Sequence, residues 1–264
     1  GTRGPGETQL ETDRRHIQRR ITDIKRKLEL VVKQREQYRK RRKENEIFQI
    51  AIVGYTNAGK STLFNQLTDS DTLEEDKLFA TLDPLTRSIS LPSGLRAIIT
   101  DTVGFIQDLP TALIAAFRST LEEVTEADFL LHVIDASHVD YEEHIHTVEA
   151  LLDELDAGSL PKLYIFNKKD LLKEEFIPLH HPHVLVSAYD EKDTEKILVK
   201  IEEVLKESWT PFHIQLEPRQ GKALNQLAKG AIITDRSFSE EDNIYHVKGY
   251  IKEKQMLNKF LKEQ

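Results

Sequence analysis

The sequence of 264 residues contains no cysteine. This absence excludes disulfides, thiolate metal ligands and cysteine nucleophiles, and it suits the reducing cytoplasm. The sequence also lacks an uncharged apolar run of the ~18 residues that a membrane-spanning helix needs. It has no basic start followed by an apolar segment, and no lipidation signal. We therefore expect a cytoplasmic protein without a membrane partner. We also expect a monomer.

Methionine is nearly absent as well, since the only one is Met256, and the chain opens with glycine. We therefore expect that further sequence precedes residue 1. The length allows one large α/β domain with smaller attachments, because single domains usually span about 50 to 250 residues.

Positive charge is concentrated at the start of the chain. Residues 1–47 have a net charge of +7 and the remaining residues −15, within the total of −8. A basic segment on an acidic protein indicates a polyanionic partner. The five consecutive cations at residues 39–43, beside Arg35, favour contact with the phosphates of folded RNA rather than base stacking. The alternative is a solvated helix face.

The same segment has the pattern of a long helix after a glycine-rich turn at residues 1–7. Spacings of four and three residues predict the a/d seam of a coiled coil. The residues of this seam are Ile17, Ile21, Ile24, Leu28, Val31 and Tyr38. We predict a basic helical, coiled-coil arm over residues 1–47, whose antiparallel partner helix precedes residue 1.

Short apolar runs after the arm predict the strands of a central sheet. The first run, at residues 47–54, ends in glycine and is typical of a buried parallel strand. Further strands are expected at 86–91, 95–100, 129–134, 162–166 and 183–187, with helices at 141–156 and 193–206. Alternating strands and helices predict an α/β fold with a doubly wound, mostly parallel sheet.

A break at residues 209–211, Trp-Thr-Pro, predicts a domain boundary. Beyond it the patterns favour a strand, a helix, two strands and a final charged helix near residues 252–262. We therefore predict a large domain over residues 48–208 and a small α+β domain over residues 209–264.

The glycine-rich segment after the first strand carries the strongest functional signal. Residues 54–61 have the pattern G-x-x-x-x-G-K-[ST] between a strand and a helix, which predicts a P-loop. Backbone N–H groups of such a loop bind phosphate at a helix N-terminus. Lys60 would neutralise the β- and γ-phosphates, and the Ser61 hydroxyl would bind Mg²⁺.

Three further motifs follow predicted strands. Asp101 suits a water-mediated Mg²⁺ contact, and the N–H of Gly104 can sense the γ-phosphate. Asp170, the last residue of 167–170, can accept two hydrogen bonds that guanine offers and adenine does not. A backbone N–H of residues 187–189 can donate to the guanine carbonyl oxygen. Four motifs in this order, all at the carboxyl ends of strands, predict a P-loop G domain that binds and hydrolyses GTP.

The segment LFATLDPLTR, residues 78–87, lies between the first two motifs. A threonine here can close onto Mg²⁺ and the γ-phosphate in the triphosphate state. Thr81 is the preferred candidate and Thr86 the weaker one, and the alternative for Thr81 is a turn cap.

These segments resemble the HflX family of ribosome-associated GTPases. The resemblance rests on GYTNAGKS, FATLDPLTR, DTVGFI, NKKD and SAY, preceded by GTRGPGETQLETDRR, of which GPGETQLE and FATLDP are the specific elements. It covers nearly the whole chain but not the family's N-terminal domain. It implies a GTPase that binds the ribosome, chiefly the large subunit and its ribosomal RNA, and that helps to split or rescue stalled ribosomes. The alternative is a GTPase in RNA modification or signalling with a different RNA or protein partner.

The resemblance also implies the residues of the site. Mg²⁺ would be held by Ser61, Thr81 and Asp101, and the catalytic positions would be Lys60, Thr81 and Gly104. The residues expected to line GTP or GDP are Gly54, Tyr55, Thr56, Asn57, Ala58, Gly59, Lys60, Ser61, Thr62, Phe79, Ala80, Thr81, Leu82, Asp83, Asp101, Thr102, Val103, Gly104, Asn167, Lys168, Lys169, Asp170, Ser187, Ala188 and Tyr189.

Two positions suggest how hydrolysis is controlled. Phe105 stands where small signalling GTPases have a glutamine that positions water, and Gln107 is displaced by two residues. We therefore expect slow unassisted hydrolysis, with the missing positioning supplied by a partner or an ion, and the resemblance implies that the ribosome stimulates hydrolysis. Asn57 stands where GTPases often use asparagine to bind K⁺ near the phosphates, and the alternative is that it stabilises the loop by its own hydrogen bonds.

Overall fold

A computed structural model describes residues 13–23, 26, 33, 37, 47–68, 85–102, 104 and 123–262 of the chain, without the side chains of Lys259 and Lys262. The chain divides into two compact units, residues 1–47 and residues 48–264, which are considered separately.

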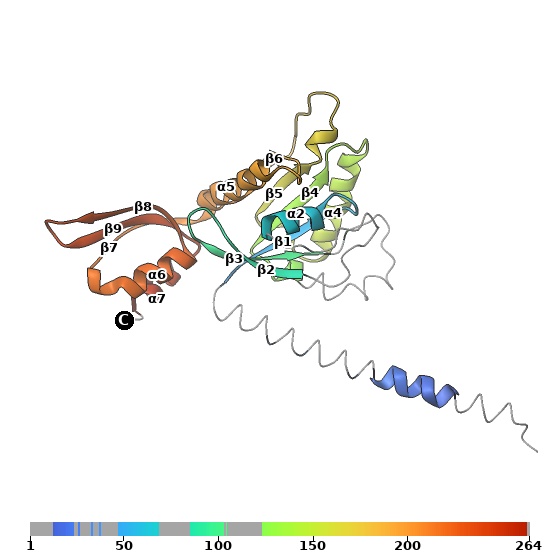
Figure 1. Cartoon of the computed structure of the whole chain (residues 1–264), viewed down its shortest axis with the longest axis horizontal. Coiled ribbons are helices and arrows are strands. Elements are labelled where there is room, and N and C mark those ends of the chain that lie inside the picture. The colour runs from blue at the N-terminus through green and yellow to red at the C-terminus, as the bar shows by residue number, and fades with distance from the viewer. Residues whose placement is uncertain are drawn as a thin grey trace, which may run out of the picture. The chain divides into compact units, whose positions relative to one another are not determined.

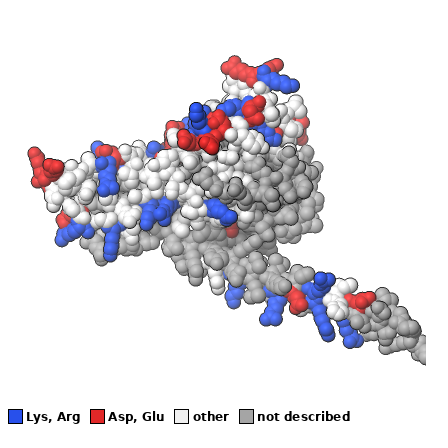
Figure 2. Space-filling view, viewed as in Figure 1, with Lys and Arg blue, Asp and Glu red and all other residues white. Residues whose placement is uncertain are grey.

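The described part of the first unit is helical and basic. Residues 13–23 form a helix in which Ile17 and Ile21 of the predicted seam are exposed. The described residues of this unit include six Lys and Arg but only two Asp, and Figure 2 shows these charged side chains along the described part of the helix. The rest of the seam and the cations at 39–43 lie outside the described residues.

A six-stranded sheet forms the centre of the second unit (Figure 1). Its strands are β1 (Phe48–Gly54), β2 (Leu85–Ser90), β3 (Arg96–Asp101), β4 (Phe129–Asp135), β5 (Lys162–Asn167) and β6 (His183–Leu185). The order is β2-β3-β1-β4-β5-β6, and all neighbours are parallel except β2 and β3, which are antiparallel. The predicted α/β fold with a mostly parallel sheet is confirmed, with strand ends that shift by one or two residues.

Helices cover both faces of this sheet. They are α2 (Lys60–Thr68), α4 (Tyr141–Glu154) and α5 (Glu191–Ser208). Alternate residues of β1 face opposite sides, because side chains alternate along a strand. Ile50 and Ile52 pack in the core that includes α2 and α5, whereas Ala51 and Val53 pack with residues of α4. The sheet is therefore buried on both sides, as parallel sheets require.

The remaining elements follow the predicted order of strand, helix, strand, strand and helix. They are β7 (Thr210–Leu216), α6 (Gly221–Gly230), β8 (Ile232–Ser239), β9 (Ile244–Ile251) and α7 (Lys254–Lys262), with a short 3₁₀ helix η2 (Pro218–Gln220) before α6. The strands form an antiparallel sheet in the order β7-β9-β8. The apolar residues of these strands and of the helices α6 and α7 form a small core, which includes Leu216, Leu227 and Val247.

These C-terminal elements also contact the larger core. The Trp209 ring meets the Phe48 ring edge-on with centroids 5.5 Å apart, and Ile232 of β8 is buried in the core of the six-stranded sheet. The boundary between residues 208 and 209 stays a prediction, since both sides belong to one compact unit. Within the described part of the chain, no helix is both long and apolar enough to span a membrane.

Candidate functional site

The predicted motifs lie at one edge of the six-stranded sheet. Gly54 ends β1, Asp101 ends β3, Asp135 ends β4 and Asn167 ends β5. Since these strands are parallel neighbours, their carboxyl ends meet at the same edge, where ligands bind in open α/β sheets.

The P-loop has a backbone that requires its glycines. At Gly59 the φ angle is +93°, and a Cβ atom would lie 2.3 Å from the Asn167 Nδ2 atom. At Gly54 a Cβ would lie 2.2 Å from the Val133 carbonyl oxygen. Asn57 has a φ of 61°, a left-handed conformation that asparagine tolerates. The loop leads directly into α2, whose N-terminus offers backbone N–H groups to an anion.

Lys60 is buried within this loop. Its Nζ atom donates a hydrogen bond of 2.9 Å to the Tyr55 carbonyl oxygen. Burial lowers the pKa of Lys60 to about 8, and attraction to Asp101 opposes that effect. A Cβ at Gly104 would lie 3.0 Å from this Nζ atom and 2.8 Å from the Thr56 Cγ2 atom. The absence of a side chain at Gly104 therefore lets its backbone approach the P-loop.

Ser61 and Asp101 come together from two different motifs. The Ser61 hydroxyl donates a hydrogen bond of 2.8 Å to Asp101 Oδ2, and the Asp101 side chain is fully buried. The hydroxyl and the neighbouring carboxylate supply oxygen ligands, which Mg²⁺ prefers. The neighbouring Thr102 hydroxyl donates instead to the Ile52 carbonyl of β1, at 2.5 Å. The Thr102 side chain therefore fixes the strand end.

Asn167 connects three loops. Its Nδ2 donates to the Ala58 carbonyl oxygen at 3.0 Å, and its Oδ1 accepts the Ala188 N–H at 2.9 Å. All three residues are buried. A buried amide with both groups hydrogen-bonded holds the connected backbone segments at fixed distances.

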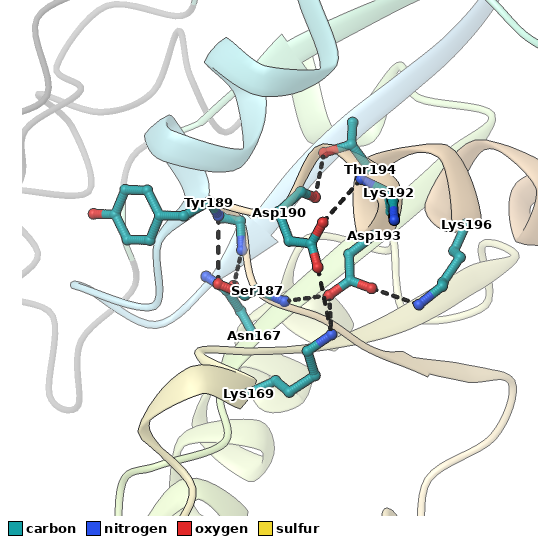
Figure 3. Close-up of polar contacts among 10 residues, drawn as sticks. Asn167, Lys169, Ser187, Tyr189, Asp190, Lys192, Asp193, Thr194 and Lys196 are labelled. Atoms are coloured by element: carbon teal, nitrogen blue, oxygen red, sulfur yellow. Dashed lines mark hydrogen bonds and ion pairs between the residues drawn. The ribbon is translucent and has the colours of Figure 1, made fainter.

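The three residues after Asn167 take different directions. Lys168 has a φ of 64°, and its Nζ donates to Asp135 Oδ2 at 2.7 Å. Burial opposes ionisation of Asp135, but hydrogen bonds from Lys168 and Ser137 outweigh it and lower the pKa of Asp135. Lys169 begins the 3₁₀ helix η1 (Lys169–Leu171), and its ammonium lies against Asp193 of α5 (Figure 3). Asp170 is left exposed at the surface.

The third predicted loop ends beside these residues. The Ser187 N–H donates to Asp193 Oδ2 at 2.9 Å, and Ser187 and Ala188 are buried, whereas Tyr189 is 72% exposed. Burial opposes ionisation of Asp193. Hydrogen bonds from Lys169, Lys196 and the Ser187 N–H outweigh it and lower the pKa of Asp193 to about 2.

Three residues of this region were not predicted from the sequence. Asp135 directly follows the strand predicted at 129–134, and this position at a strand end could have identified it in the sequence. Asp193 lies within a helix and has no such signal. His144 of α4 stacks on the Tyr55 ring, with centroids 3.8 Å apart and an interplanar angle of 6°. No local pattern pairs a helix histidine with a P-loop tyrosine.

Some predicted residues lie outside the described part of the chain. They are Phe79, Ala80, Thr81, Leu82, Asp83, Val103, Phe105 and Gln107. Thr86, the weaker alternative to Thr81, belongs to β2, and its hydroxyl lies 3.2 Å from the hydroxyl of Thr100 on β3. Thr86 therefore pairs with Thr100 across the two strands.

Comparison with protein families gives two matches. A family described as "50S ribosome-binding GTPase" matches residues 49–168, and a family described as "GTP-binding GTPase Middle Region" matches residues 1–42. The first match contains the P-loop, Asp101 and Asn167.

Several curated relatives carry the name GTPase HflX. One from Alkalihalophilus pseudofirmus is 53% identical over 100% of this chain and 63% of its own length. Another, from Escherichia coli strain K12, is 42% identical over 92% of this chain and 58% of its own length. The chain therefore spans about 60% of the length of these relatives.

Among solved structures, similarity extends to a GTP-binding protein from the hyperthermophilic archaeon Sulfolobus solfataricus in complex with GDP. It aligns with 76% of this chain and 61% of its own, with 26% sequence identity and a TM-score of 0.52.

Proposed function

The chain belongs to the HflX family of GTPases, and from this premise we propose that it binds GTP and GDP, hydrolyses GTP and associates with the ribosome in the cytoplasm. We assign nucleotide binding to a G domain over residues 48–208. Ribosome contact is assigned to the basic arm over residues 1–47, and a small domain over residues 209–264 completes the chain.

The assignment of nucleotide binding rests on the two hydrogen bonds of the Asn167 side chain. Its amide joins the P-loop at Ala58 to the loop at Ala188, so the expected phosphate and base sites form one connected unit. In this assignment, N–H groups at the start of α2 bind the phosphates and Lys60 neutralises their charge. Asp170 accepts hydrogen bonds from guanine, and a backbone N–H of the loop at 187–189 donates to the guanine carbonyl oxygen.

Ser61 and Asp101 would hold Mg²⁺, with Thr81 joining them in the GTP state. Mg²⁺ at this position would neutralise charge on the phosphate oxygens. Ser61→Ala should therefore reduce the gain in nucleotide affinity that Mg²⁺ gives, and should leave the affinity measured in EDTA nearly unchanged. Ser237→Ala, on an exposed position of β8, is the matched control.

Unassisted hydrolysis should be slow, because the Phe105 ring cannot orient water by hydrogen bonding. Rates near the intrinsic range of about 10⁻⁴ to 10⁻² s⁻¹ are expected for the free protein. Phosphate release from GTP, with and without ribosomes, tests this expectation. A free protein that is as fast as the ribosome-bound one would contradict a partner-stimulated enzyme.

Ribosome binding is supported by the positive charge of the arm and by the family description of 50S ribosome binding. Cosedimentation with ribosomal subunits should be stronger with a GTP analogue than with GDP. Neutralising Arg39, Lys40, Arg41 and Arg42 should weaken it and flatten its salt dependence, by about one unit of slope per lost phosphate contact. Salt dependence identical to that of the unmodified chain would contradict phosphate contact by the arm.

A further inference from the structure

Asp193 is a buried carboxylate with three hydrogen-bond donors around it. Its side chain is 0% exposed. Oδ2 accepts the Ser187 N–H at 2.9 Å and the Lys169 ammonium, and Oδ1 accepts the Lys196 ammonium at 2.7 Å (Figure 3). Removing one partner of a buried charge is strongly destabilising, because the remaining charge loses its compensation. The carboxylate therefore holds each of these groups firmly.

The two lysines on Asp193 have different positions in the chain. Lys196 lies on α5, three residues from Asp193 on the same helix, and it is 60% exposed. Lys169 is the first residue of η1, next to Asp170, and it is 37% exposed. Its ammonium also lies 4.0 Å from Asp190 Oδ2. Of these two lysines, Lys169 is the one that connects the Asp170 loop to α5.

Asp170 is held on its N-terminal side by two anchors in different directions. Lys168 is bonded to Asp135 at the end of β4, and Lys169 is bonded to Asp193 on α5. The Lys169 N–H also donates to the Val186 carbonyl at 3.0 Å. These contacts fix the Asp170 backbone relative to the loop at 187–189, which Asp193 itself holds through the Ser187 N–H.

We propose that Lys169 and Asp193 are positioning residues for guanine recognition, a role that rests on the proposed function. A carboxylate and a backbone N–H from two separate loops must match two edges of one base, and small displacements weaken such hydrogen bonds. The Lys169–Asp193 pair sets the distance between those loops without touching the nucleotide. Lys169 then contributes through its ammonium to base selectivity rather than to phosphate charge.

The test compares GDP with IDP. The hypoxanthine base of IDP differs from guanine only in lacking the exocyclic amine, which would donate a hydrogen bond to Asp170. The unmodified chain should bind GDP roughly 10- to 100-fold more tightly than IDP. Lys169→Met should lower this ratio about tenfold. Lys196→Met removes the other lysine from the same carboxylate and should keep the ratio within about twofold. Lys169→Arg, which keeps the charge, should restore most of it.

Each outcome has a separate meaning. An equal fall of the ratio in both methionine variants, or an unchanged ratio in Lys169→Met, would overturn the positioning role. If Lys169→Met does not fold, as judged by circular dichroism, Lys169→Gln removes the ammonium charge with less loss of polarity. Since the role is assigned to that charge, an unchanged ratio in Lys169→Gln would also overturn it. An unmodified chain that does not prefer GDP to IDP would instead overturn the guanine assignment of the proposed function.

Discussion

The side-chain amide of Asn167 donates a hydrogen bond of 3.0 Å to the carbonyl oxygen of Ala58, which lies 109 positions earlier in the chain. The same side chain accepts the Ala188 N–H from a third loop. Gly59 leaves room for this contact, since a Cβ there would lie 2.3 Å from Asn167 Nδ2. One buried side chain thus couples the P-loop to the loops that surround the expected base site.

Asn167→Asp should weaken GDP binding about 10- to 100-fold, because it replaces a donor with a carboxylate oxygen that faces the Ala58 carbonyl. Titration of a fluorescent GDP analogue measures the effect. Asn258→Asp makes the same change in charge at an exposed position of α7 and should leave the affinity unchanged. Equal affinities for the two variants would contradict a connecting role for Asn167.

Asp170→Asn should shift nucleotide preference from GTP toward xanthosine triphosphate. The extra carbonyl of xanthine pairs with an amide donor, whereas the amine of guanine does not. Competition binding with the two nucleotides measures the exchange, and ATP is the control that should bind weakly to both forms. Unchanged GTP affinity, with no gain for xanthosine triphosphate, would remove Asp170 from the base site.

The low pKa of Asp193 predicts a specific acid sensitivity. A carboxyl with a folded pKa of about 2, below its ordinary 3.8, contributes stability that is fully present above pH 3.8 and is lost as the pH falls through 2. At neutral pH this contribution is about 2 kcal/mol. Asp193→Asn should lower the free energy of unfolding at pH 7 and should make it less dependent on pH between about 4 and 2.

Urea unfolding at several pH values measures this difference. Asp235→Asn, at an exposed position of β8, should keep the pH dependence of the unmodified chain. Parallel stability curves for Asp193→Asn and the unmodified chain below pH 4 would contradict the paired state of Asp193.

The stack between His144 and Tyr55 predicts a role for α4 in holding the P-loop. The Tyr55 carbonyl accepts the Lys60 ammonium, so displacement of Tyr55 should also displace Lys60. Aromatic pairs contribute about 0.5 to 1.5 kcal/mol, and His144→Ala should therefore weaken GDP binding about 2- to 10-fold. His144→Phe, which keeps a stacking ring, should bind normally.

His146→Ala is the matched control for that variant, because His146 is an exposed histidine of the same helix. If His144→Phe is as weak as His144→Ala, ring stacking is not what supports the P-loop.

Asn57 provides a test for K⁺. If its amide oxygen helps to bind K⁺ near the phosphates, replacement of K⁺ by Na⁺ should slow GTP hydrolysis more than it weakens GTP binding. Asn57→Gly can still adopt the φ of 61° but has no side-chain amide. This variant should abolish the difference in hydrolysis rate between K⁺ and Na⁺. Equal rates in K⁺ and Na⁺ for the unmodified chain would leave the left-handed backbone as the reason for asparagine at this position.

Local sequence patterns determined the order of the strands and helices and the position of the P-loop. The apolar runs that alternate with helical segments predicted the parallel sheet, because buried strands need apolar residues on both faces. The order of strand, helix, strand, strand and helix after Trp209 was also predicted. The motif around Lys60 and Ser61 was recognisable because loop geometry and phosphate chemistry require those residue types at neighbouring positions.

Only the tertiary structure decided which side chains meet. Lys168 and Lys169 are adjacent and chemically equal, yet one pairs with Asp135 and the other with Asp193. The left-handed backbone at Lys168 helps to turn these neighbours toward different elements. Each carboxylate then pairs with the cation that the fold places beside it, because a buried carboxylate without a compensating charge is strongly destabilising. Sequence spacing contains no information on that choice, since it depends on the directions of β4 and α5 in space.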